Sequence, residues 1–84
     1  MNKEVNLASL EAGHTGIISS IIGGDNFVLK LESMGIRPGS RVTKISNLFY
    51  KGPVVIHVGG TDVAIGHRMA GKILVTPNPS EIPL

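Results

Sequence analysis

Residues 31–40, with the sequence LESMGIRPGS, restrict the fold of this chain more than any other stretch. Just upstream, apolar residues recur at intervals of three and four, which stacks them on one face of a helix. These residues are Phe27, Val28, Leu31 and Met34. The pattern predicts a short helix over residues 27–34, which the following residues must end abruptly.

The predicted helix ends at Gly35, because glycine tolerates the left-handed backbone conformation that commonly closes a helix. With Gly35 in that position, Leu31 and Ile36 form the apolar pair of a Schellman motif. Pro38–Gly39 fits the two central positions of a type II turn, since the second of them needs a positive φ. The stretch therefore predicts a helix, a tight turn and then a strand that starts at Arg41.

The composition favours a single, mostly β domain. The 84 residues include 42% hydrophobic residues, 11 glycines and only two Phe and one Tyr. Short β-branched runs separated by glycine turns suit such a composition better than a helical bundle does. The chain has no cysteine, which excludes a disulfide scaffold, a thiolate metal site and a cysteine nucleophile.

Five short strands are expected, at residues 14–22, 41–49, 54–58, 62–65 and 72–76. In the first, isoleucines fall on both faces, which predicts a strand that is covered on both sides. In the second, Val42, Ile45 and Leu48 recur every three residues, and a β-bulge would reconcile that spacing with a strand. Strands this short and curved avoid exposed edges by closing on themselves, which predicts a small β-barrel.

Smaller elements connect these strands. Asp25 or Asn26 is expected to cap the helix, and Gly59–Gly60 is expected to form a tight hairpin turn. Single helical turns are expected at residues 6–13, with Leu7 and Leu10 facing the core, and at residues 66–71. The folded domain is expected to span residues 1–76, and the proline-rich residues 77–84 form a non-regular tail.

Charge and hydropathy restrict the location and the partners. The net charge is +2 and the basic residues are scattered, whereas nucleic-acid binders concentrate theirs in a stripe. The first sixteen residues contain no long apolar run, so no signal peptide is expected. No segment approaches the roughly 18 apolar residues of a membrane span, so no direct membrane insertion is expected.

No motif for catalysis is present. The serines lack the Gly-x-Ser-x-Gly spacing of a nucleophile elbow, and the glycines lack the spacing of a phosphate-binding loop. His14, His57 and His67 have no second metal ligand three or four residues away on a helix. The sequence therefore predicts a non-enzyme without a cofactor or metal site, while weak divalent-metal binding by two histidines that meet across the barrel stays open.

The order of motifs resembles a known family. LxxLxxG at residues 7–13 precedes Gly16-Ile-Ile18, and then come LxxMGIxPG at residues 31–39 and Gly52-Pro-Val54. A Gly-Gly hairpin, Ala64-Ile-Gly66 and AxxIxV at residues 70–75 follow. Together these motifs resemble the FeoA family of bacterial ferrous-iron-transport accessory proteins, and they cover nearly the whole chain. One departure is Lys30, which stands where many members carry an arginine and lacks the bidentate guanidinium fork.

This resemblance implies an SH3-like β-barrel in the cytoplasm that assists ferrous iron uptake. The implied partner is FeoB, a membrane permease with a GTP-binding cytoplasmic domain, and the implied mechanism is protein–protein interaction. On that analogy the partner-binding residues are Ile36, Arg37, Pro38 and Arg41. The alternative is a free-standing FeoA-like domain of a metal-dependent regulator, similar to the C-terminal domain of DtxR-like repressors. Pairing of edge strands into homo-oligomers is left open.

Overall fold

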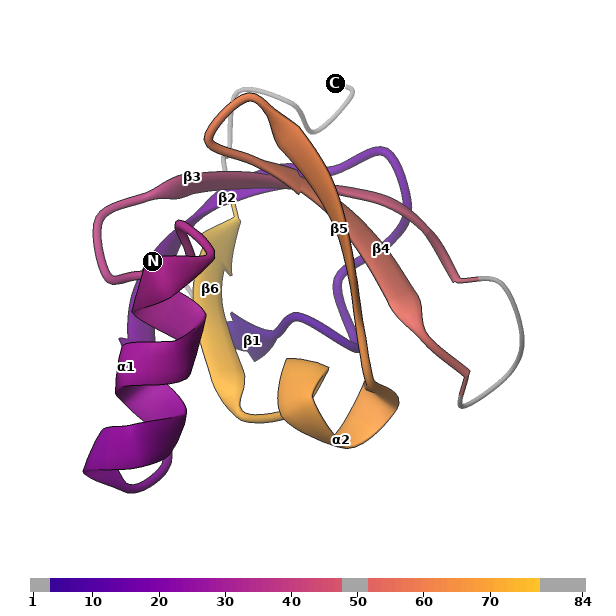
Figure 1. Ribbon diagram of the computed structural model, residues 1–84. Coiled ribbons are helices and arrows are strands. Elements are labelled where there is room, and N and C mark those ends of the chain that lie inside the picture. The colour runs from indigo at the N-terminus through magenta and orange to yellow at the C-terminus, as the bar shows by residue number, and fades with distance from the viewer. Residues whose placement is uncertain (1–3, 48–51, 78–84) are drawn as a thin grey trace.

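The computed structural model describes residues 4–47 and 52–77 as one curved antiparallel sheet with two short helices (Figure 1). Along the chain the elements are β1 Val5–Asn6, β2 Thr15–Ile21, α1 Asp25–Ser33, β3 Arg41–Asn47, β4 Val54–Val58, β5 Thr61–Ile65, α2 His67–Ala70 and β6 Ile73–Pro77. The prediction of a small, mostly β fold with a helix after the first long strand is confirmed. The structure adds a sixth strand, β1, and it places Pro77 in β6 instead of the tail.

The strands lie in the order β1-β6-β2-β3-β4-β5. The sheet bends around its buried face; α1 lies at the left of the view, and α2 lies at the bottom, between the end of β5 and the start of β6 (Figure 1). Thirteen hydrophobic residues fill the bowl, and nine of them are 0% exposed: Leu7, Leu31, Ile36, Val42, Val54, Ile56, Ala70, Ile73 and Val75. Leu7 and Leu10 join this core, as predicted.

The end of α1 has the predicted backbone geometry. The Ile36 N–H donates to the Leu31 carbonyl at 2.9 Å, and the Gly35 N–H donates to the Glu32 carbonyl at 3.0 Å. Gly35 has a φ of 86°, and the Leu31 and Ile36 side chains are both fully buried. These are the two hydrogen bonds and the apolar pair of a Schellman motif.

The predicted turn at Pro38–Gly39 is also confirmed. The Ser40 N–H donates to the Arg37 carbonyl at 3.0 Å, and Gly39 has a φ of 92°. The Gly39 N–H then donates to the Ile18 carbonyl at 2.8 Å, which ties the turn to β2. The helix end and the start of β3 are therefore held in one fixed orientation.

Two local predictions are wrong. The residue that precedes the first turn of α1 is Gly24, without a side-chain cap, and Asp25 is already helical, where its carboxylate favours the positive helix N-terminus. β2 is not covered along the whole of both faces, because Ile18 is 1% exposed whereas Ile17, on the opposite face, is 41% exposed. An antiparallel sheet commonly packs one face on the core and leaves the other in solvent, and β2 follows that rule.

The bulge predicted for β3 is present. The pairing of β3 with β4 shifts register between Lys44 and Ser46. The consequence for the side chains differs from the expectation, because Ile45 points outward and is 46% exposed, while Lys44 points inward beside Val42 and is 1% exposed. Leu48, the third residue of the predicted apolar series, lies outside the described residues.

Lys44 is the one buried residue with a formal charge in the part of the chain that the structure describes. Its Nζ donates to the Ala8 carbonyl at 2.8 Å. Its backbone N–H donates to the His14 carbonyl at 3.0 Å, and its carbonyl accepts from the Gly13 N–H at 2.7 Å. One residue of β3 therefore holds both ends of the turn that joins β1 to β2.

The free energy of unfolding is expected to rise with pH from neutral toward about 10.5 more steeply in the wild type than in a Lys44→Met variant. Burial lowers the Lys44 pKa below its ordinary value of 10.5, so the unfolded chain binds more protons than the folded chain between the two values. Below the folded-state pKa, burial of the charged ammonium lowers the free energy of unfolding by its full amount. As pH rises toward the unfolded-state pKa, the buried amine loses its proton and this loss of stability disappears. Urea unfolding of both proteins at several pH values measures this, and equal pH slopes would contradict it.

Candidate functional site

A groove lies between the C-terminal end of α1 and the tip of the β4–β5 hairpin. Its volume is about 520 Å³. Glu32, Met34 and Arg37 line it from the helix side, and Val58, Thr61 and Val63 line it from the hairpin side. The Schellman motif shapes the first wall, and the two-residue turn at Gly59–Gly60 shapes the second.

The groove combines apolar and polar surface in similar amounts and carries two charges of opposite sign. Met34 and Val63 are half-buried and pack against the core, and Val58 belongs to the core itself. Glu32 is half-buried and Arg37 is exposed, and neither forms an ion pair within residues 4–47 and 52–77. A chain segment with an apolar and a charged side chain is the kind of group that such a surface fits.

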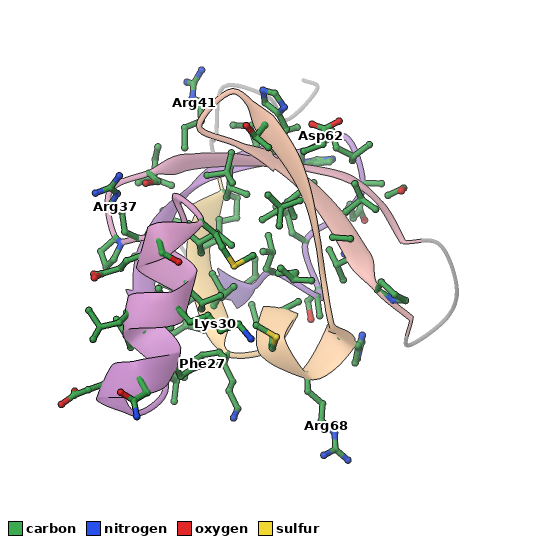
Figure 2. All side chains as sticks on the ribbon, in the orientation of Figure 1. Phe27, Lys30, Arg37, Arg41, Asp62 and Arg68 are labelled. Atoms are coloured by element: carbon green, nitrogen blue, oxygen red, sulfur yellow. The ribbon has the colours of Figure 1, made fainter. Side chains whose placement is uncertain are left out.

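The predicted partner-binding residues separate into two groups. Ile36 is fully buried, so its assignment to a contact surface is corrected: as the last residue of the Schellman motif it packs into the core. Arg37, Pro38 and Arg41 are exposed, and Arg37 lines the groove. Figure 2 shows Arg37 and Arg41 projecting into solvent on the side where α1 ends. A role of these three residues in binding stays a prediction.

The sequence did not indicate the hairpin wall of the groove. Thr61 and Val63 lie more than twenty residues after Arg37 in the chain and reach it only because β3 pairs with β4, with Val42 opposite Val58. Met34, which lies on the apolar face of the predicted helix, contributes to both the core and the groove. The adaptability of methionine side chains at binding surfaces was the one available signal.

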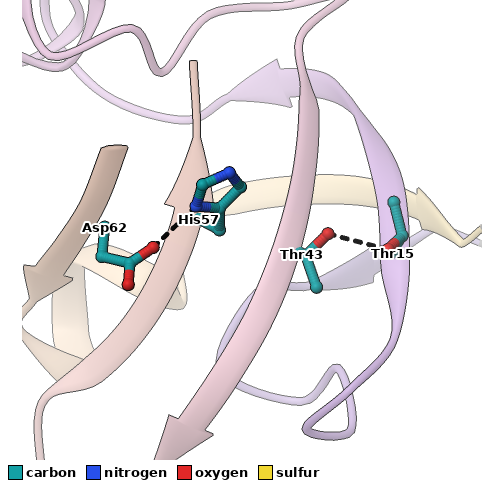
Figure 3. A network of polar contacts seen from close by, with 4 residues as sticks. All are labelled: Thr15, Thr43, His57 and Asp62. Carbon is teal, nitrogen blue, oxygen red and sulfur yellow. Dashed lines mark hydrogen bonds and ion pairs between the residues drawn. The ribbon is translucent and has the colours of Figure 1, made fainter. Parts of the chain in front are cut away.

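A row of polar side chains crosses the outer face of the sheet (Figure 3). Thr15 Oγ1 and Thr43 Oγ1 lie 2.8 Å apart, and His57 Nδ1 lies 2.6 Å from Asp62 Oδ1. The register places these residues opposite one another in sequence from β2 to β5. Within the described residues no group of three or more His, Asp or Glu side chains could hold a metal ion. We therefore treat the row as cross-strand stabilisation.

The sequence profile of the FeoA domain matches residues 5–77. The chain belongs to the FeoA domain family. A relative named putative Fe(2+) transport protein A, from Methanocaldococcus jannaschii, is 39% identical over 69 residues, which cover 82% of this FeoA-family chain and 82% of the relative.

Solved structures agree with the family. The crystal structure of an iron uptake regulatory protein (FeoA) superposes with a TM-score of 0.82 and 37% identity, covering 90% of this chain and 99% of that one. A manganese-dependent transcriptional repressor superposes equally well, with a TM-score of 0.82, but at 20% identity and over only 44% of the repressor chain. The second likeness shows the fold alone. The SH3-like small β fold expected of the family is therefore confirmed. No helix in the described part of the chain is long and apolar enough to cross a membrane.

Proposed function

We propose that this FeoA-family protein is a non-catalytic, cytoplasmic accessory of ferrous iron uptake that docks on the GTP-binding cytoplasmic domain of a FeoB-type permease. The family and the name of the Methanocaldococcus relative support the link to Fe(2+) transport. The observation that carries the docking mode is the groove itself, where the exposed Arg37 guanidinium shares the lining with Met34, Val58 and Val63. Docking at this surface modulates the assembly of the permease or its GTP-driven transport.

A pull-down with the tagged protein tests the partner. Membranes of the native organism, grown under iron limitation, are solubilised in detergent, and the bound proteins are identified by mass spectrometry. Recovery of the FeoB-type permease supports the proposal. Recovery of a metal-responsive repressor without the permease would overturn it in favour of a regulatory role.

Charge reversal at Arg37 is expected to weaken binding to the permease's purified cytoplasmic domain by about tenfold or more, because a rim charge that meets a carboxylate becomes repulsive. The thermal midpoint is expected to change little, since the Arg37 side chain is exposed and makes no ion pair within the described residues. Isothermal titration of the Arg37→Glu variant measures the affinity.

The matched control is Arg68→Glu, which reverses an exposed arginine on α2 at the far end of the molecule (Figure 2). Both substitutions change the net charge by the same amount, so a general electrostatic effect would weaken binding of the two variants to the cytoplasmic domain equally. Equal affinities of Arg37→Glu and wild type would remove Arg37 from the docking site.

A further inference from the structure

Within residues 4–47 and 52–77, β5 is the last strand of the sheet and pairs with β4 alone. The pairing runs without a register shift from Val58 opposite Thr61 to Val54 opposite Ile65. Because Val58 and Thr61 flank a two-residue turn, they form a hydrogen-bonded pair, and bonded pairs then alternate along the hairpin. The pairs that include Thr61, Val63 and Ile65 are therefore the bonded ones.

The backbone groups of Asp62 and Ala64 consequently point away from β4. Neither residue has another backbone hydrogen bond within residues 4–47 and 52–77. Both residues are exposed, so these donors and acceptors face solvent at the edge of the sheet. An edge strand of this kind is a template for pairing with another chain.

β5 also lacks the features that commonly protect such an edge. Its sequence, TDVAI, contains no lysine and no proline, and its pairing contains no bulge. Its one charged side chain, Asp62, is bound by His57 at 2.6 Å on the outer face (Figure 3). The edge is therefore regular, and none of the described strands covers it.

The groove lies on the inner side of this same strand. Thr61 and Val63 point inward and line it, while Met34 and Arg37 form the opposite wall. Side chains of an added strand alternate between the two faces of the sheet, so every second one would enter the groove. The apolar wall favours an aliphatic side chain there, and Arg37, which is exposed and unpaired among the described residues, favours a carboxylate next to it.

We propose that the partner docks as an extended segment that adds to the free edge of β5, with an aliphatic side chain in the groove and a carboxylate at Arg37. This inference rests on the proposed function, since the segment belongs to the cytoplasmic part of the permease. Backbone hydrogen bonds to Asp62 and Ala64 supply affinity that does not depend on side chains, and the groove supplies selectivity. Glu32, on the same wall as Arg37, repels a second carboxylate and so restricts the position of the first.

Substitution of Ala64 tests the added strand. Proline is tolerated at sheet edges, and Ala64→Pro removes an N–H that points away from β4 and places a ring in the path of the incoming strand. We expect about a tenfold or greater loss of affinity for the purified cytoplasmic domain of the permease. Ala64→Thr is the control, because it keeps the N–H and has a high β propensity.

A second measurement needs no substitution. In the ¹⁵N-labelled wild-type protein, the Asp62 and Ala64 amides are expected to become protected from hydrogen exchange when the cytoplasmic domain binds. If the wild type binds but Ala64→Pro binds equally and these amides stay unprotected, the added strand is overturned while the proposed function stands. If the wild type does not bind at all, the proposed function fails and this inference fails with it.

Light scattering after gel filtration examines the remaining occupant, a second copy of this chain. A wild-type dimer that becomes monomeric in Ala64→Pro would assign the β5 edge to self-association and overturn the proposal. A monomeric wild type that forms a one-to-one complex with the cytoplasmic domain supports the proposal.

Discussion

Replacing Lys44 with alanine is expected to lower the free energy of unfolding by about 3 kcal/mol. The substitution removes a fully buried aliphatic stem, and it leaves the Ala8 carbonyl without the Nζ donor that lies 2.8 Å from it. A domain of this size has a total stability on the order of 5–10 kcal/mol, so such a loss is a large part of it. The thermal midpoint should fall by about 10–20 °C.

Urea unfolding followed by circular dichroism measures the change. Lys44→Met is the control that separates the two causes, because methionine keeps most of the volume and removes the ammonium group together with its desolvation cost. We expect the methionine variant to lie much closer to the wild type than the alanine variant does. An alanine variant as stable as the wild type would show that the Lys44 stem does not fill the core.

Replacing Gly16 with alanine is expected to lower the free energy of unfolding by about 2–4 kcal/mol. Gly16 is buried in β2, opposite Pro77 of β6. A Cβ at this position would contact the Val75 side chain and would lie 2.7 Å from the Thr76 carbonyl oxygen, which belongs to the backbone. Since a backbone atom cannot turn aside as a side chain can, β2 and β6 would have to separate.

Gly66→Ala is the matched control for this substitution. Its added Cβ meets no atom within 4 Å, and its backbone φ of −63° suits any residue. A change within about 1 kcal/mol is expected there, because alanine is only a poorer residue than glycine at a helix N-terminus. Amide hydrogen exchange should show the loss in Gly16→Ala along β2 and β6. Equal stabilities of the two variants would contradict the steric argument.

The parts of the fold that depend on neighbouring residues were predictable from the sequence. The Schellman motif, the type II turn and the Gly59–Gly60 hairpin each follow from a few consecutive residues whose backbone preferences agree. The bulge in β3 was predicted because the apolar spacing did not fit a regular strand. The direction in which the bulge turns each side chain was not predictable, and Lys44 therefore took an inward position that the pattern gave to Ile45.

Only the helix-side wall of the groove was predictable from the sequence, because that wall alone depends on neighbouring residues. Arg37 lies two residues after Gly35 and just before the turn, so its exposure could be inferred from local structure, whereas the burial of Ile36 depends on how the motif packs against the sheet. The second wall of the groove comes from β5, which only the order of strands brings to the helix end. No local pattern in the sequence carries that information.

The position of β6 in the sheet determines when the domain can fold during its synthesis. β6 lies between β1 and β2 in the sheet, although β6, at residues 73–77, is the last of these strands to leave the ribosome. Before β6 is available, β1 has no strand to pair with, and β2 pairs with β3 on one edge only. The core also lacks Ile73 and Val75. The nascent chain therefore exposes apolar surface until β6 has been synthesised. The native sheet is complete only when β6 pairs with β1 and β2.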